Sequence, residues 1–149
     1  MPFDQSLAPH FESLNREWIE KDFVVEETDL LVFSDPFGQI VALGGEVFFV
    51  ISGGNVVGTC AVIPHGEKDF ELAKMAVTAG ARGQGFGDLL IERVIDFAKQ
   101  AGAQKLILVS NTLLGPAIKL YEKHGFKSVP ITDAGDYTRV DIQMELPLI

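Results

Sequence analysis

The sequence predicts one mixed α/β domain, in which a twisted central sheet is flanked by helices. Two runs rich in β-branched and aromatic residues lie within residues 46–63 and are separated by the turn-forming residues 52–55, which predicts an antiparallel hairpin. A glycine-rich segment, residues 82–87, follows a strand-like run at 70–77 and opens a helix-like run. That helix leads to a buried-looking strand at 105–110, and such a crossover makes the two strands parallel.

Length and composition agree with one domain that spans residues 1–149. A chain of 149 residues is long enough to bury a sizeable core. Hydrophobic residues make up 47% and charged residues 22%, which is ordinary for a water-soluble protein. No apolar run reaches the ~20 residues of a membrane span, and the first residues lack the layout of a signal peptide. With one cysteine no intrachain disulfide can form, so we expect a cytoplasmic location and no membrane partner.

The net charge limits the partners. Twelve Lys and Arg stand against 21 Asp and Glu, giving −9. This excludes nucleic acid bound through a general basic surface. It favours a cationic small molecule, an amine or a basic peptide as substrate, although a requirement for solubility alone would also explain the charge.

The N-terminal third predicts two helices. Apolar residues within 7–18 recur at spacings of four, three and four, which places them on one face of a helix. Residues 23–27 break this period and predict a loop or a short extended piece. Asp35, followed by proline, starts a short second helix that ends at Gly44. A short strand at the extreme N-terminus or near residues 30–33 is left open.

The C-terminal half completes an order of two helices, three strands, a helix, a strand, a helix and two strands. A long helix is expected at about residues 85–101, before the strand at 105–110. A shorter helix is expected at 114–124, followed by strands at 126–129 and 139–146.

The glycine-rich segment predicts a phosphate site. Glycines alternate at positions 83, 85 and 87, so the backbone can turn tightly and approach a ligand without Cβ clashes. A glycine turn that opens a helix also points free N–H groups outward at the positive end of the helix dipole. This arrangement binds phosphate, so a phosphate-bearing cofactor is expected.

The spacing distinguishes among phosphate loops. The nucleoside-triphosphate loop requires a Lys followed by Ser or Thr after the last glycine, which is missing. The dinucleotide fingerprint requires a third glycine where Leu90 stands. The pattern R-x-x-G-x-G, preceded by Met-Ala-Val, instead resembles the acetyl-CoA motif of the GNAT N-acetyltransferase superfamily, with matches at Arg82, Gly85 and Gly87.

A second motif strengthens this resemblance. Asn111 follows the parallel strand, and Ala117, Tyr121, Gly125 and Phe126 match the family's N…A-x-x-[LF]-Y-x-x-x-G-F segment. The two motifs cover roughly residues 70–130, in the family's order and on the expected elements. The resemblance implies the GNAT acyl-CoA N-acyltransferase fold, acetyl-CoA as co-substrate and a primary amine as acceptor.

The resemblance also implies a set of cofactor-binding residues. Backbone N–H groups of the glycine loop would hold the pyrophosphate, and the backbone at the end of the preceding strand would face the pantetheine arm and the oxyanion, where the parallel strands are expected to splay apart. Arg82 is expected to act by position rather than charge, and Asp88 to turn its carboxylate away. Asn111 would bind the cofactor or a bridging water, or cap the next helix. The whole set is Met75, Ala76, Val77, Arg82, Gly83, Gln84, Gly85, Phe86, Gly87, Asp88, Asn111, Ala117 and Tyr121.

Two residues are candidates for proton transfer. The resemblance makes Tyr121 the acid that protonates the departing thiolate, whereas outside this context a helical tyrosine would simply pack. Glu71 is the candidate base for the amine, on a strand face expected to be shared with Ala73, Met75 and Val77. Alternatively, Glu71 is an exposed residue paired with a nearby lysine, and ordered water serves as the base.

Acidic and aromatic residues gather where this fold binds its acceptor, by resemblance. They would suit a cation such as a polyamine, a lysine side chain or an aminoglycoside, although each alone is compatible with a solvated loop. They are Trp18, Phe23, Glu26, Glu27, Asp29, Asp133, Asp136 and Tyr137.

No metal site is expected. His10, His65 and His124 do not have metal-ligand spacing with one another or with cysteine. Cys60 lies in a strand-like run and is interpreted as a small buried residue rather than a reactive thiol.

The leading hypothesis is therefore an acetyl-CoA-dependent N-acetyltransferase that acts by direct transfer to a primary amine. One alternative is a non-catalytic acyl-CoA-binding sensor or partner module. A weaker one is a nucleotide-binding module that uses the same glycines. The apolar last strand is also compatible with a homodimer.

Overall fold

The structure is a computed structural model that describes residues 1–131 and 139–148, and for Asp22 the backbone alone. Within these residues six strands form one mixed sheet, in the order β1-β2-β3-β4-β6-β5. Only β3 and β4 run parallel among the pairs described. The strands are β1 (Glu46–Ser52), β2 (Asn55–His65), β3 (Asp69–Val77), β4 (Lys105–Ser110), β5 (Lys127–Val129) and β6 (Ile142–Pro147).

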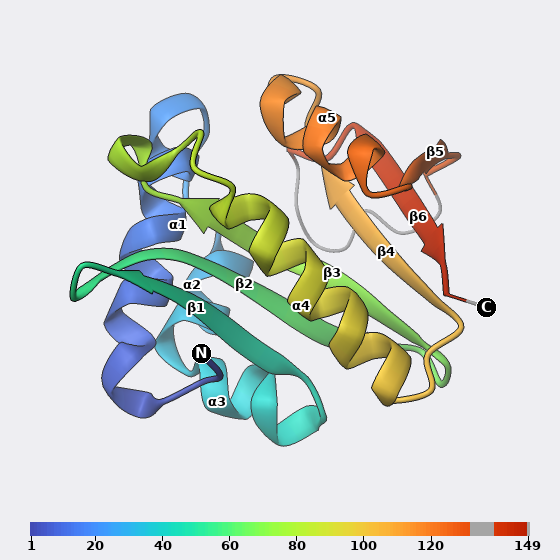
Figure 1. Ribbon diagram of the computed structural model, residues 1–149, viewed down its shortest axis with the longest axis horizontal. Helices are drawn as coiled ribbons and strands as arrows, with labels where there is room; N and C mark the ends of the chain where they lie inside the picture. Colours follow the sequence, from blue (N-terminus) through green and yellow to red (C-terminus); the bar gives the residue numbers. More distant parts are fainter. Residues whose placement is uncertain (132–138, 149) are drawn as a thin grey trace.

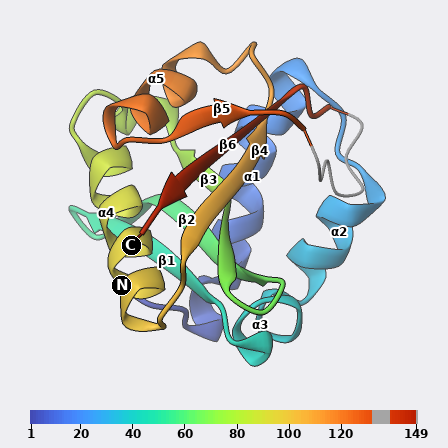
Figure 2. The same ribbon diagram turned by 90° about the vertical axis from the view of Figure 1, so that its right-hand side faces the viewer.

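Helices cover both faces of the sheet (Figures 1 and 2). One face carries α1 (Ala8–Asp22), α2 (Glu27–Ser34) and α3 (Pro36–Gln39). The other face carries α4 (Phe86–Gln100) and α5 (Gly115–Lys123). Each face buries its own apolar core, so the alternating side chains of the central strands are distributed between the two.

The two cores follow the alternation of β1. Val47 and Phe49 lie in the α1-side core together with Phe11 of α1, whereas Phe48 lies in the α4-side core. Phe11 is fully buried and meets Phe33 of α2 edge to face, with ring centroids 5.8 Å apart. The apolar face predicted for the first helix is therefore the face that contacts the sheet.

The predicted fold class, hairpin and parallel crossover are confirmed. The start of the short helix at Asp35 is also confirmed, because the carboxylate of this residue accepts the N–H of Gly38 at 3.0 Å. Its predicted end at Gly44 is wrong, since α3 ends at Gln39 and a separate 3-10 turn, Val41–Leu43, leads to Gly44. The predicted loop is confirmed for residues 23–26, whereas the strand left open near residues 30–33 is not formed, because this segment belongs to the helix α2. α2 has apolar residues all round, including exposed Leu30 and Leu31, so no amphipathic period marks it.

The strands β3 and β4 pair over a short stretch and then diverge. Their register covers only Asp69–Glu71 against Lys105–Ile107, although both strands continue beyond it. Figure 1 shows the green β3 and the orange β4 separating toward their C-terminal ends. The predicted splaying of the parallel strands is confirmed, and among the described residues it leaves the β4 side of β3 without a strand partner after Glu71.

A β-bulge at Lys74 corrects the predicted strand faces. Lys74 has φ = 54°, in the left-handed region, and the register with β2 shifts between Thr59 and Ala61. One extra residue reverses the alternation of side chains after the bulge. Met75 and Val77 therefore pack in the α4-side core.

Glu71 lies on the opposite face of β3. It pairs with Ile63, whose side chain packs in the α1-side core, and the next residue but one, Ala73, pairs with Ala61 of the same core. The predicted shared face of Glu71 with Ala73 is thus confirmed, and the shared face with Met75 and Val77 is wrong.

Candidate active site

One cavity of about 580 Å³ lies where β3 and β4 diverge. Its walls come from both faces of the sheet, since Tyr121 of α5 and Trp18 of α1 both line it. We call "loop end" the part lined by residues 82, 83, 85–88, 111, 113, 114, 116 and 117, and "network end" the part lined by Trp18, Lys21, Glu71, Lys74 and Arg139. Gln84 of the glycine loop does not line the cavity. Glu71 and Val77 are six positions apart on β3, so this strand alone spans about 20 Å of the wall.

The glycine loop has the features of an anion site. Gly83 and Gly85 have φ of 81° and 85°, and a Cβ on either would meet nothing within 4 Å. Among the described residues, the N–H groups of residues 83–88 have no backbone or side-chain acceptor. Because α4 begins at Phe86, these groups also lie at the positive end of its dipole. The residues present therefore fit a pyrophosphate.

Gly87 serves a different purpose from its neighbours. A Cβ at this position would lie 2.6 Å from Cδ2 of Leu120. The missing side chain thus lets α4 and α5 approach each other closely.

Arg82 is used in closing the loop. Its Nε donates to the carbonyl of Val77 at 3.1 Å, and its Nη2 lies 3.9 Å from the carboxylate of Glu17. The same carboxylate accepts from the hydroxyl of Thr78 at 2.8 Å and from the N–H of Ala79 at 3.0 Å. Glu17 was missed by sequence reasoning, since nothing in the pattern of the first helix distinguishes it from other exposed acids.

Asp88 joins α4 to α5. Its carboxylate accepts from Lys123 at 2.9 Å and lies 2.8 Å from Nε2 of His124. The hydrogen bond from Lys123, followed by that of His124, lowers the pKa of Asp88 below its ordinary value. The carboxylate is thereby engaged by α5 instead of by the N–H groups of the loop.

Asn111 holds the segment before β6. Its side-chain amide donates to the carbonyl of Arg139 at 2.7 Å, and its Oδ1 accepts the N–H of Leu113 at 2.9 Å. The N-cap of α5 is Leu114. The prediction that Asn111 caps this helix is therefore wrong, while its contact with a cofactor stays a prediction.

Tyr121 lies in the wall of the cavity with only 8% of its surface exposed. The ring centroids of Tyr121 and Phe126 lie 6.0 Å apart. Ala117, one helical turn before Tyr121, also lines the cavity. Burial raises the pKa of the phenol well above its ordinary value. The phenol therefore keeps its proton at neutral pH, as a proton donor must before it acts.

Glu71 lines the network end and is half-buried. It stands at the last paired position between β3 and β4, opposite Ile107. Its negative charge is one of the factors that raise the pKa of Lys74. Glu71 is therefore half-buried instead of exposed, and both its role as base and its alternative pairing with a nearby lysine stay predictions.

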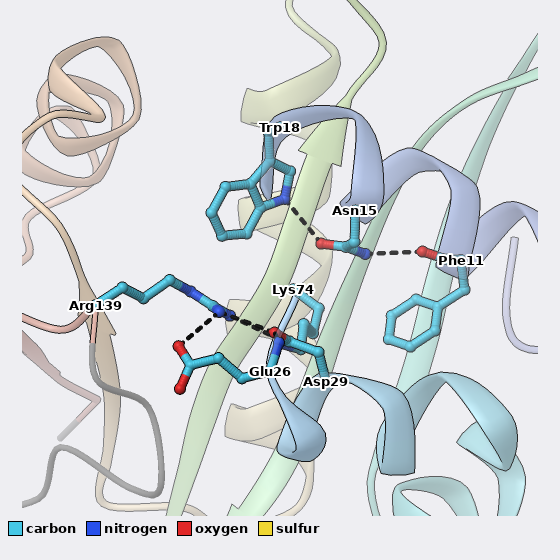
Figure 3. A network of polar contacts seen from close by, with 7 residues as sticks. All are labelled: Phe11, Asn15, Trp18, Glu26, Asp29, Lys74 and Arg139. Atoms are coloured by element: carbon cyan, nitrogen blue, oxygen red, sulfur yellow. Dashed lines mark hydrogen bonds and ion pairs between the residues drawn. The ribbon is translucent and has the colours of Figure 1, made fainter. Parts of the chain in front are cut away.

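A buried ionic network closes the network end (Figure 3). Asp29 is fully buried and accepts from Lys74 and, through two bonds of 2.7 and 2.8 Å, from Arg139. Arg139 also donates to Glu26 at 3.2 Å and lies 5.5 Å from the ring of Trp18. Four separate segments of the chain meet in this network.

The network fixes the charge of its members. Burial by itself would raise the pKa of Asp29, but hydrogen bonds from Arg139 and Lys74 outweigh it and lower the pKa to about 2. Burial lowers the pKa of Lys74, and the bond to Asp29 offsets part of that effect. Asp29 is therefore an anion across the physiological range.

The cluster expected to receive a cation is thus changed by the structure. Glu26 and Asp29 are engaged by two cations, so they do not form an uncompensated acidic surface. Phe23 packs against Trp18 with ring centroids 6.2 Å apart, and Glu27 is exposed at the start of α2. The remaining members, Asp133, Asp136 and Tyr137, lie outside the described residues.

Three further observations concern the chemistry of the chain. Cys60 is fully buried, and burial raises the pKa of its thiol. In the part of the chain that the structure describes, no three His, Cys, Asp or Glu side chains are arranged to hold a metal ion. Within the same residues, no helix combines the length and the apolar character that crossing a membrane requires.

Comparison with known proteins adds the family. The family model described as "Acetyltransferase (GNAT) domain" matches residues 44–128, which include the glycine loop and Tyr121. A mouse protein, "Probable N-acetyltransferase family 8 member 5", is 30% identical over 129 residues, covering 82% of this chain and 53% of that protein. The chain thus spans about half the length of this curated relative. It spans less of others, for example 39% of the rat protein "N-acetyltransferase family 8 member 2".

Solved structures share the fold. An acetyltransferase of the GNAT family from Staphylococcus aureus Mu50 superposes with a TM-score of 0.91 over 100% of this chain and 98% of that one, at 17% identity. A putative acetyltransferase from Salmonella typhimurium, solved with its cofactor acetyl-CoA, gives a TM-score of 0.74 over 100% and 94%, also at 17% identity. With the match of the family model over more than half of its residues, this chain belongs to the GNAT acetyltransferase family.

Proposed function

We propose that this chain transfers the acetyl group of acetyl-CoA directly to a primary amine. The observation that carries the proposal is a single cavity that joins unpartnered loop N–H groups, a protonated phenol and a half-buried carboxylate. Family membership and relatives named as N-acetyltransferases support the reaction class. We expect the acceptor to be a small cationic amine, an amino acid or a lysine side chain, and the reaction to take place in the cytoplasm.

The loop end would bind the co-substrate. The N–H groups of residues 83–88 would hold its pyrophosphate, as Gly83 and Gly85 allow close approach. When bound, acetyl-CoA supplies an acetyl group activated as a thioester. The β4 side of β3 beyond Glu71 offers backbone groups that no strand occupies, and residues 75–77 would hydrogen-bond the pantetheine arm and the carbonyl oxygen there.

Two side chains would move the protons. Glu71 accepts a proton from the acceptor ammonium, leaving the nitrogen lone pair free to form the new N–C bond. As the C–S bond breaks, Tyr121 gives its proton to the sulfur, and the phenolate that results takes up the remaining surplus proton of the new amide nitrogen through water, which restores the phenol. No covalent intermediate on the protein is required, and the described cysteine is buried.

The test is a thiol-release assay with acetyl-CoA against polyamines, amino acids, aminoglycosides and lysine peptides. Release of CoA with one class would support the proposal and identify the acceptor class. Calorimetric binding of acetyl-CoA without transfer to any amine in the panel would contradict it and favour a non-catalytic acyl-CoA sensor.

Tyr121→Phe separates these two functions. We expect turnover to fall by about 10²-fold, because the substitution removes the proton donor and preserves the packing against Phe126. The affinity for CoA, measured by calorimetry, should stay unchanged. Unchanged turnover in an active enzyme would contradict the role of the phenol.

A further inference from the structure

The bulge of β3 is held in a conformation that its own residue disfavours. Lys74 is the one non-glycine residue with positive φ in the described part of the chain. The left-handed region is unfavourable for a side chain with a Cβ, and a lysine gains nothing there from a local hydrogen bond of the kind that asparagine makes. Contacts of the side chain must therefore stabilise this backbone conformation.

The ammonium group of Lys74 is held by two contacts with α2. The ammonium group donates to the buried carboxylate of Asp29 and lies 5.5 Å from the centroid of the Phe33 ring. Only 5% of the side chain is exposed. The lysine is thus anchored to α2 through one carboxylate and one aromatic ring.

Asp29 is in turn fixed from the other side of the cavity. Arg139 donates two bonds to its carboxylate, and the N–H of Glu26 donates a third at 2.9 Å. The carbonyl of Arg139 accepts from Asn111, which follows β4. We call Lys74, Asp29 and Arg139 the latch, since together they connect β3 to the region of β4 across the gap between the strands.

The bulge lies where the cavity begins. The last paired residue of β3 with β4 is Glu71, and the bulge follows three positions later. Bulges bend a strand and end its pairing, and they re-aim the residues that follow. The backbone of residues 75–77, which line the cavity, owes its direction to this bend.

We propose that the latch holds the bulge of β3 in shape, and that Lys74 and Asp29 are positioning residues that aim the backbone of residues 75–77 at the acetyl group. This inference rests on the proposed function. Neither side chain needs to touch the substrate for this role, since the latch acts through the conformation of the main chain.

Two substitutions at one position test the latch in the full chain. Lys74→Ala removes the anchor and leaves a residue that disfavours the left-handed conformation. Lys74→Gly removes the same anchor but accepts that conformation at no steric cost. In both variants Asp29 keeps its two bonds from Arg139, so its charge stays paired and we expect both variants to fold.

We expect kcat/KM of Lys74→Ala to fall by about 10²-fold, the cost of a small displacement of reacting groups. Hydrogen exchange at the amides of residues 75–77 should accelerate about tenfold, reflecting the penalty of a left-handed alanine. Lys74→Gly should lose much less kcat/KM than Lys74→Ala and show a smaller rise in exchange, because glycine accepts the bulge conformation although the anchor is missing. A merely structural ion pair would affect both variants alike, since both lose it.

Two outcomes would overturn the inference. Equal damage in both variants would mean that the charge of Lys74, and not the backbone conformation, is required. Full activity and unchanged exchange in Lys74→Ala would mean that the latch is dispensable. If the unchanged chain transfers no acetyl group, the proposed function fails, while amide exchange in the two variants still decides whether the latch holds the bulge.

Discussion

The two ends of the cavity are built in opposite ways. The loop end consists mainly of consecutive residues, 82–88, whose N–H groups are open and whose glycines have free space beside them. The network end is lined by side chains from three segments, and the Asp29 carboxylate of a fourth is completely buried beside their cations. The loop end therefore has the features of a preformed anion-binding site, whereas the network end is a part of the cavity wall that is held by ion pairs.

The two ends of the cavity therefore depend on different kinds of interaction, backbone N–H groups at one and buried ion pairs at the other. A helix N-terminus supplies partial positive charge from the backbone itself, so its function depends on glycine spacing and little else. A buried ion pair contributes only if every partner is in place, because an uncompensated charge in the interior costs much more than the pair returns. Substitutions should therefore damage binding at the loop end, and catalysis or folding at the network end.

The largest effect is expected from Glu71→Gln, which would show that the network end carries the chemistry. Turnover should fall by ~10²–10⁴-fold, because the amide cannot accept the proton of the acceptor ammonium. The acetylation rate measured across pH should also lose its dependence on the carboxylate. Glu67→Gln, in the exposed turn before β3, is the matched control. Unchanged turnover across pH would leave ordered water as the base.

The next effect is expected in stability, from Asp29→Asn. The substitution leaves Lys74 and Arg139 buried beside a neutral group, and breaking such a pair costs about 3–5 kcal/mol. Chemical denaturation at neutral pH measures this loss. Asp35→Asn is the control, since this exposed N-cap keeps its hydrogen bond as asparagine.

The stability difference between the unchanged chain and Asp29→Asn should also depend on pH. The pKa of Asp29 is about 2 in the folded chain and about 3.9 in an unfolded one. Its stabilising contribution is therefore complete above pH ~4 and is lost as the pH falls toward 2. The difference in free energy of unfolding between the unchanged chain and Asp29→Asn should shrink over this window. A constant difference would contradict the charge of Asp29 as its cause.

The smallest effect is expected at the loop end, from Gly85→Ala compared with Gly66→Ala. Both glycines have positive φ, and a Cβ on either meets nothing within 4 Å. Each alanine should lower the free energy of unfolding by about 1–2 kcal/mol. Only Gly85→Ala should weaken CoA binding, by about tenfold, because its Cβ and strained backbone disturb the anion site. Equal CoA affinity in the two variants, measured by calorimetry, would remove the loop from the binding site.

The sequence by itself determined the sheet, the crossover and the loop end. These depend on local patterns: alternation within strands, a helical period, and glycines at fixed spacing before a helix. The sequence also indicated Tyr121, because most of the motif that contains it lies on a single helix. Each of these signals lies within one element or between elements adjacent along the chain, so the sequence alone can show it.

Only the tertiary structure decided the network end. Lys74 lies 45 positions after Asp29 in the sequence, and Arg139 lies 110 positions after it. No local sequence pattern links the three residues. The bulge at Lys74 reversed the faces of β3, so simple alternation misplaced Met75 and Val77 relative to Glu71. Glu26 and Asp29, two of the acids predicted to attract a cation, are paired with cations of the protein, since the charge of a residue acquires its role only from the neighbours that folding brings to it.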